Sequence, residues 1–136
     1  MPGSKFFDLD GNGMLPLRDG EINLIVAKLV FHYIPDIEPV VDNLARIATP
    51  SGFVVVSVPH PDRTAKKVAD ARLDEVAYQD EIGDFGLVTT MIRRSRSMYE
   101  QIFADRGFEI DAIDEPRLLD ETISRRLNMR FRKTQR

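Results

Sequence analysis

Four stretches of the chain have the apolar pattern of β-strands. Residues 22–28 (INLIVAK) and 53–58 (FVVVSV) are continuous apolar runs, which is typical of parallel strands that are buried on both faces. Residues 108–113 (FEIDAI) and 127–133 (LNMRFRK) alternate apolar and polar side chains, so each should have one wetter face. The pattern therefore predicts two central strands and two less buried strands, of which the last is antiparallel to its neighbours.

Helical patterns fill two of the intervals between these strands. An apolar stripe at helical spacing covers residues 37–48, and Asp36 is its expected N-cap. Ser97 and Glu100 have the spacing of a capping box, in which each side chain accepts a hydrogen bond from the other residue's backbone N–H. We expect this second helix to reach residue 105.

The segment between residues 62 and 90 has a weaker pattern. Residues 65–76 (AKKVADARLDEV) predict a helix with a polar face, and residues 79–86 (QDEIGDFG) predict an exposed loop. Residues 88–92 predict a short strand. The segment thus interrupts an otherwise regular order of strands and helices.

Composition limits the class of protein. A chain of 136 residues with a net charge of −3 is one domain, and the charge argues against a general nucleic-acid or membrane-surface protein. The absence of cysteine excludes disulfides and thiolate zinc sites and fits a reducing compartment. We expect a cytoplasmic protein, since no signal peptide is visible and the longest apolar stretch, residues 22–34, is too short to span a membrane.

Polar side chains follow both continuous apolar strands. Lys28, His32 and Tyr33 come after the first strand, and His60 comes after the second. Open α/β sheets bind ligands at the carboxyl ends of their strands, so these residues are candidates for ligand contact. Each also has a structural alternative, because a histidine in this position is often packed and hydrogen-bonded and a lysine can extend to solvent. His60 is in addition a candidate general base.

Two charged segments allow a functional and a structural interpretation. Residues 8–19 (DLDGNGMLPLRD) nearly match a calcium-binding EF-hand loop, but residues 1–7 are too few for the entering helix, and we expect no metal. The alternative is a solvated acidic loop. The arginines at residues 93–96 either bind an anionic acceptor or flank a helix start. The basic segment 125–136 suits a solvated strand face better than a nucleic-acid contact.

Four motifs in a fixed order give the chain a family resemblance. They are MLPLRDGEINLIV at residues 14–26, FHYIPD at 31–36, ATPSG with VSVPHP within 48–61, and RSRSMY with GF and EP within 94–116. In this order they resemble the C-terminal half of a class I S-adenosylmethionine-dependent methyltransferase of the small-molecule type. The resemblance covers nearly the whole chain from residue 8.

The resemblance implies a fold and a set of site residues. The fold would be α/β, a partial Rossmann-like methyltransferase fold with a mostly parallel sheet, a final antiparallel strand and helices on both faces. The activity would be methyl transfer from S-adenosylmethionine to a small molecule. His60 would be catalytic, Tyr33 and Arg94 would contact the acceptor, and the cofactor would contact Asp8, Asp10, Met14, Leu15, Lys28 and His32.

The sequence also departs from the family pattern. The glycine-rich cofactor loop is not found, and Asn23, Ser51 and Arg93 replace an aspartate, a glycine and a histidine of the family motifs. We therefore expect residues 1–7 to be a disordered lead or tag remnant and residues 8–136 to be the C-terminal part of a methyltransferase-like domain. Such a chain would be inactive alone, or it would be a non-catalytic binding or oligomerisation module.

The same departures predict a partner. The strand at residues 22–28 would lack its neighbour on one side, and an open apolar edge favours pairing with another chain. We expect a homodimer through the exposed edge of this strand or through the adjoining helices. A small-molecule acceptor is the other expected partner, and neither a membrane nor a nucleic acid is expected.

Overall fold

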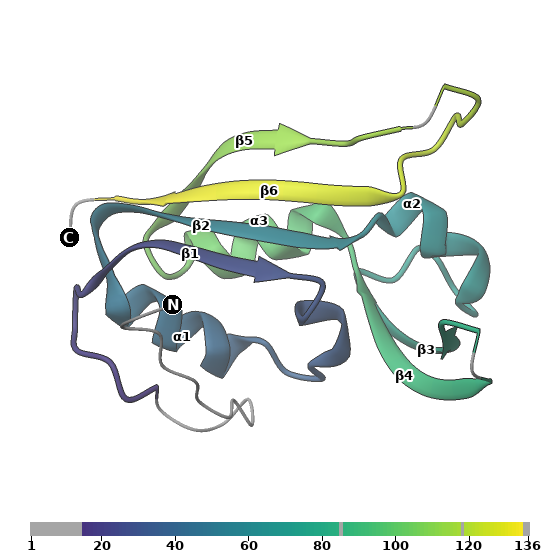
Figure 1. The fold of residues 1–136 in the computed structure, drawn as a ribbon, viewed down its shortest axis with the longest axis horizontal. Helices are drawn as coiled ribbons and strands as arrows, with labels where there is room; N and C mark the ends of the chain where they lie inside the picture. Colours follow the sequence, from purple (N-terminus) through teal and green to yellow (C-terminus); the bar gives the residue numbers. More distant parts are fainter. Residues whose placement is uncertain (1–14, 85, 118, 135–136) are drawn as a thin grey trace.

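The computed structural model describes residues 15–84, 86–117 and 119–134 (Figure 1). The predicted roles of Asp8, Asp10 and Met14, and the predictions for residues 1–7, lie outside these residues. In chain order the elements are β1 (Ile22–Lys28), the 3-10 turn η1 (Phe31–Tyr33), α1 (Glu38–Ile47), β2 (Ala48–Pro59), α2 (Pro61–Thr64), the 3-10 turn η2 (Ala65–Lys67), β3 (Glu75–Ile82), β4 (Leu87–Arg94), α3 (Arg96–Ala104), β5 (Phe108–Asp114) and β6 (Arg126–Lys133).

The main sheet has four strands in the order β1-β2-β6-β5. β1 and β2 are parallel, and β6 is antiparallel to both of its neighbours, β2 and β5. β5 consequently runs in the same direction as β1 and β2. The predicted α/β fold, a partial Rossmann-like sheet with its last strand antiparallel, is confirmed.

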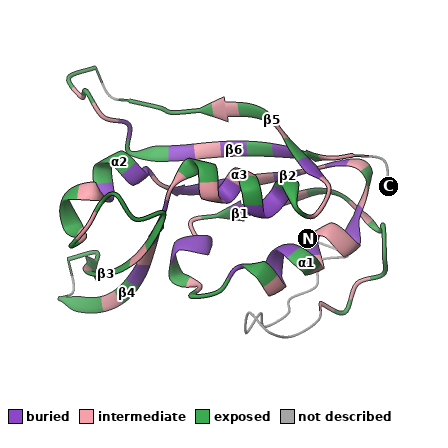
Figure 2. Cartoon of the chain, turned by 180° about the vertical axis from the view of Figure 1, so that it is seen from behind, coloured by how far each residue is buried: buried purple, intermediate pink, exposed green. Residues whose placement is uncertain are grey.

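One hydrophobic core joins this sheet to α1 and α3. Val54, Val56 and Phe131 point into it from the strands and are fully or almost fully buried, and the Phe103 ring of α3 stacks on Phe131 at 4.0 Å. Figure 2, drawn from behind, shows α1 and α3 on the same side of the sheet. The helices expected on both faces therefore lie on one face among the described residues.

No described element covers the opposite face of the sheet at β1. Leu24 and Val26 of β1 are 57% and 62% exposed, whereas Ala27 between Val26 and Lys28 is buried. The prediction that residues 22–28 form a strand buried on both faces is wrong. A continuous apolar run shows that a strand suits burial, but the presence of a covering layer depends on elements elsewhere.

The weakly patterned segment forms a two-stranded antiparallel hairpin, β3 and β4. The predicted helix at residues 65–76 is wrong, because only the 3-10 turn η2 at residues 65–67 is helical there. The predicted loop at residues 79–86 is also wrong over its first half, since β3 extends to Ile82. β3 is mostly polar and exposed, so its strand character comes from pairing with β4 and not from an apolar period.

The helix termini differ from the prediction in detail. Ser95, not Ser97, caps α3, with its hydroxyl accepting a hydrogen bond from the Met98 N–H at 3.2 Å. Asp36 does contribute to the start of α1, since its carboxylate accepts from the Glu38 N–H at 3.1 Å. Ser51, in the turn where the family has a glycine, has a positive φ of 66°.

Candidate functional site

A cavity lies beyond the carboxyl ends of β1 and β2. Its volume is about 480 Å³, and it is bordered by η1, by α2 with η2, by the β3–β4 hairpin and by the start of β6. In open α/β sheets this edge is the usual ligand position. The residues that line it include His32, Tyr33, Lys67, Tyr78, Asp80, Met91, Arg125 and Arg126.

His32 and Tyr33 form one wall of the cavity. Their rings lie 4.0 Å apart, with His32 buried and Tyr33 41% exposed. The pKa of His32 is lowered to about 4, mainly by burial and secondly by the charge of the nearby Arg94 guanidinium. The imidazole is therefore neutral at neutral pH. The His32 Nδ1 is buried without a hydrogen-bond partner among the described residues. The wall therefore presents a neutral imidazole beside a half-exposed phenol.

Tyr78 and Met91 form the facing wall on the hairpin, where they are paired across β3 and β4. Both are buried. Burial, followed by the Asp80 carboxylate, raises the pKa of Tyr78 to about 12. The phenol hence stays protonated, and this wall is apolar and aromatic with an O–H at its tip.

Arg94 fixes the turn that carries His32 and Tyr33. Its side chain has no exposed surface, and its guanidinium donates to the Phe31 carbonyl at 2.9 Å, the Ile34 carbonyl at 2.6 Å and the Pro35 carbonyl at 3.0 Å. Its Nε donates to the Glu75 carboxylate at 2.9 Å. These hydrogen bonds hold the turn that forms the cavity wall, and the geometry favours a positioning role for Arg94. A direct contact between Arg94 and the acceptor stays a prediction.

Arg93 makes a similar connection on the other side of the hairpin. Its Nε donates to the Pro61 carbonyl at 2.8 Å, and its Nη1 donates to the Ala71 carbonyl at 3.2 Å and the Leu73 carbonyl at 3.4 Å. The adjacent arginines at the end of β4 thus attach the hairpin to the segments that follow β1 and β2. These bonds explain how a polar two-stranded hairpin keeps a defined place beside the sheet.

His60 caps α2. Its Nδ1 accepts a hydrogen bond from the Asp62 N–H at 3.1 Å, and its Nε2 lies 3.5 Å from a Glu115 carboxylate oxygen. The side chain is buried and is not among the residues that line the cavity. Since the Nδ1 lone pair is already used, a role as general base stays a prediction, and the geometry favours the structural role.

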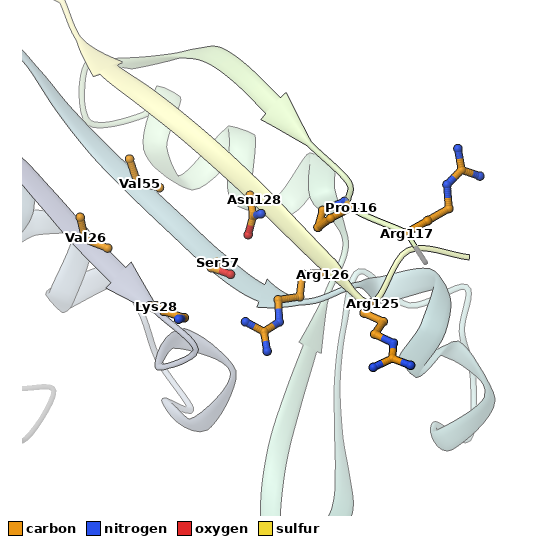
Figure 3. A pocket seen from close by; sticks show the side chains of 9 residues that line it. All are labelled: Val26, Lys28, Val55, Ser57, Pro116, Arg117, Arg125, Arg126 and Asn128. Atoms are coloured by element: carbon orange, nitrogen blue, oxygen red, sulfur yellow. The ribbon is translucent and has the colours of Figure 1, made fainter. Parts of the chain in front are cut away.

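Lys28 lies apart from the cavity, in an adjacent groove on the open face of the sheet (Figure 3). The groove has a volume of about 570 Å³, and Val26 and Val55 point into it from β1 and β2. Its cations are Lys28, Arg117, Arg125 and Arg126, and no acidic residue lines it within the described part of the chain. Arg125 and Arg126 border both the groove and the cavity.

Leu15 lies at the opposite end of β1. Its N–H donates to the Asn43 side chain at 3.2 Å, and its carbonyl accepts from Arg46 at 2.8 Å, in the last turns of α1. The structure therefore brings His32 and Tyr33 together and places Lys28 nearby, but it does not bring Leu15 to them. Any contact between Leu15 and the cofactor stays a prediction.

Sequence reasoning missed the hairpin side of the cavity, Tyr78 and Met91, and the basic side, Arg126. Tyr78 stood just before a segment interpreted as a loop, and Arg126 was interpreted as part of a solvated strand face. The one available signal was the aromatic Tyr78 within a polar stretch. Over residues 15–84, 86–117 and 119–134 there is no group of three or more His, Asp or Glu side chains placed to hold a metal ion. Nor does any helix in these ranges have the length and apolar character to cross a bilayer.

The sheet order and the cavity at the carboxyl ends of parallel strands define a Rossmann-like α/β domain. The profile of the methyltransferase domain family matches residues 6–113. The chain therefore belongs to the methyltransferase domain family, as the sequence motifs predicted. No protein of curated function gives a significant match.

Solved structures of S-adenosylmethionine-dependent methyltransferases have the same fold. A Listeria monocytogenes protein assigned to this group has a TM-score of 0.76 at 19% identity, over 89% of this chain and 65% of its own. A Mesorhizobium loti methyltransferase has a TM-score of 0.74 at 19% identity, over 92% of this chain and 67% of its own. Burkholderia thailandensis 1,6-didemethyltoxoflavin-N1-methyltransferase has a TM-score of 0.56 at 13% identity, over 85% of this chain and 45% of its own. The chain thus spans about two thirds of the first two proteins.

Proposed function

We propose that this protein is an S-adenosylmethionine-dependent methyltransferase acting on a small molecule, and that its acceptor binds in the cavity beyond β1 and β2. One observation carries the proposal: the 480 Å³ cavity lies at the carboxyl ends of two parallel strands and has aromatic walls. The Burkholderia neighbour supports a small-molecule acceptor, since that protein holds 1,6-didemethyltoxoflavin together with S-adenosylhomocysteine.

The chain's own residues would bind and orient the acceptor. Tyr33 offers a half-exposed ring. The turn that carries Tyr33 is held in place by the hydrogen bond from the buried Arg94 guanidinium to the Phe31 carbonyl. Tyr78 closes the opposite side from the hairpin. Methyl transfer depends strongly on placing the acceptor atom in line, so a fixed wall is the main contribution expected from these residues.

The described residues fit one wall of a cofactor site. Lys28 is exposed at the end of β1 and His32 follows on η1, but no glycine-rich loop lies within the described ranges. S-adenosylmethionine supplies an electrophilic methyl group on a sulfonium when bound. Lys28 and His32 are the described residues that would border it, while Asp8, Asp10 and Met14 keep their predicted roles only as a proposal.

Calorimetric titration of the 136-residue chain tests the cofactor part of the proposal. S-adenosylmethionine and S-adenosylhomocysteine should bind saturably with a Kd below about 1 mM, equivalent to about −4 kcal/mol. Methionine is the control ligand, because it lacks the adenosine, and it should bind more weakly. The absence of heat from either adenosyl ligand at millimolar concentration would overturn the proposal for this polypeptide.

A second candidate function is association without catalysis, and we propose a homodimer through β1 as its form. The observation that favours it is the open edge of β1, which pairs with β2 on one side and has no partner on the other among the described residues. Leu24 and Val26 of the same strand are mostly exposed. An uncovered apolar edge strand is a template for pairing with a second chain.

Multi-angle light scattering with matched variants tests this association. Val26→Lys puts a charge on the edge strand, and Val88→Lys puts the same charge on the hairpin at nearly the same exposure, 60% against 62%. We expect a dimer for the wild type and for Val88→Lys, and a monomer for Val26→Lys. A monomeric wild type at high micromolar concentration, or equal behaviour of the two variants, would argue against a dimer through β1.

A further inference from the structure

The cavity has a charge balance that points to one class of acceptor. Among the described residues, the cations that line it are Arg63, Lys67, Arg125 and Arg126, and the one acid that lines it is Asp80. This local excess is opposite to the net charge of the whole chain, −3. A cavity with low-dielectric walls and charges of one sign concentrates ligands of the opposite sign.

Three of these cations already have carboxylate partners. Lys67 forms an ion pair with Asp80, and both Arg63 and Arg125 form ion pairs with Glu121, at 2.7 and 3.1 Å. The hydrogen bond and charge of Lys67 lower the pKa of Asp80, which keeps that carboxylate ionised. These three cations face two carboxylates, so the paired groups by themselves leave one positive charge in excess.

Arg126 adds a second positive charge, because it lies outside these ion pairs. Its exposed guanidinium has no acidic partner among residues 15–84, 86–117 and 119–134. Its position is fixed because it opens β6 opposite Pro59, the last residue of β2. Figure 3 shows its side chain turned across the end of β2 toward β1. A guanidinium in such a place suits a carboxylate or a phosphate, which it can bind through two parallel hydrogen bonds.

The other walls of the cavity suit a planar ring. Tyr33 and Tyr78 border it with aromatic rings, and Met91 adds a polarisable thioether. His32 adds no positive charge, because its imidazole is neutral above about pH 4. An ammonium-bearing ligand placed near the start of β6 would meet the charge of Arg126.

We propose that the acceptor bound in this cavity is a small aromatic acid, with its ring against Tyr33 and Tyr78 and its anionic group on Arg126. This inference rests on the proposed function for the identity of the site as the acceptor site. The binding chemistry itself rests on the lining residues alone, so the two can fail separately.

Ligand-observed NMR titration with two probes of equal shape tests the inference. The probes are 4-hydroxybenzoate and 4-hydroxybenzamide, which share the ring and differ in charge. We expect the acid to bind the wild type at least about fivefold more tightly, since a charge-assisted hydrogen bond contributes about 1 kcal/mol beyond a neutral one. Tyr33→Ala should weaken the binding of both probes, because it removes an aromatic ring that lines the cavity.

Two arginines of β6 provide matched variants. Arg126→Gln should abolish the preference for the acid. Arg132→Gln removes the same charge from the same strand, at a residue paired with Glu109 and outside the cavity, and should keep the preference. Both side chains are exposed, so unchanged urea midpoints would verify folding. Equal affinity for the two probes, a preference that survives Arg126→Gln, or failure of both probes to bind would overturn the inference.

The outcomes separate this inference from the proposed function. If S-adenosylhomocysteine binds and the acid preference is absent, the anionic acceptor is wrong and the methyltransferase proposal stands. If the acid preference depends on Arg126 and neither adenosyl ligand binds, the cavity is an aromatic-acid site and the methyltransferase proposal fails for this chain.

Discussion

Replacement of Arg94 by methionine should strongly destabilise the protein. The substitution keeps most of the apolar length of the side chain and removes a guanidinium that has no exposed surface. The Phe31 carbonyl loses a donor in a buried place, at a cost of about 1–3 kcal/mol, and the part-buried carbonyls of Ile34 and Pro35 lose theirs at about 1 kcal/mol each. Glu75 can return to water, because its side chain is 43% exposed.

The expected loss is therefore about 3–5 kcal/mol, a large part of the roughly 5–15 kcal/mol that holds a typical domain folded. Urea unfolding followed by circular dichroism measures it, and the thermal midpoint should fall by about 4 °C per kcal/mol. Arg96→Met is the matched control. Its guanidinium is 52% exposed and pairs with Glu100 four residues on, so it should cost under about 1 kcal/mol.

Arg94→Lys adds a second test, because lysine keeps the charge but cannot reach three carbonyls and a carboxylate with a planar fork. The free energy of unfolding of Arg94→Lys should lie between those of the wild type and Arg94→Met. The reasoning would be refuted if Arg94→Met unfolded within about 1 kcal/mol of Arg96→Met. A destabilised Arg94→Met whose Tyr33 and His32 resonances stay in place would refute the positioning role while leaving the stability estimate intact.

Three further predictions concern other residues. The folded-state pKa of His32 is about 4, against an ordinary 6.5. The neutral imidazole therefore contributes fully to the stability of the fold above about pH 6.5. This contribution is lost as the pH falls toward 4, because His32 of the unfolded chain takes up a proton and that of the folded chain does not. Between pH 6.5 and 4, the free energy of unfolding should fall further for the wild type than for His32→Gln, by up to about 3 kcal/mol. The same decrease with pH in both proteins would contradict this prediction. His60→Asn should keep the cap of α2 and the stability, whereas His60→Ala should lose about 1 kcal/mol; equal loss would speak against the cap. Gly52→Ala should lower the melting temperature, since its Cβ would lie 2.8 Å from Thr49 Oγ1 and 2.9 Å from the Thr49 carbonyl, at a cost of about 1–3 kcal/mol.

The candidate site could be predicted in part. His32 and Tyr33 were found because they directly follow an apolar strand, and the carboxyl end of a parallel strand is a ligand position whatever the remaining fold. Arg94 was singled out by the sequence but given a ligand-binding role, because an arginine in a motif gives no sign of whether its donors meet a ligand or a carbonyl. Its partner Phe31 lies 63 residues away along the chain. Tyr78 and Arg126 reach the cavity only through the hairpin and the sheet order.

The sequence by itself determined the strands at residues 22–28, 53–58, 108–113 and 127–133 and both main helices, because apolar periodicity and chain-breaking residues act over a few neighbouring positions. It also determined the family, since the motifs and their order are local. Tertiary structure decided which face of β1 is covered, how β6 inserts between β2 and β5, and that the polar residues of β3 form a strand. Each of these depends on a partner far along the chain, and residue spacing does not specify that partner.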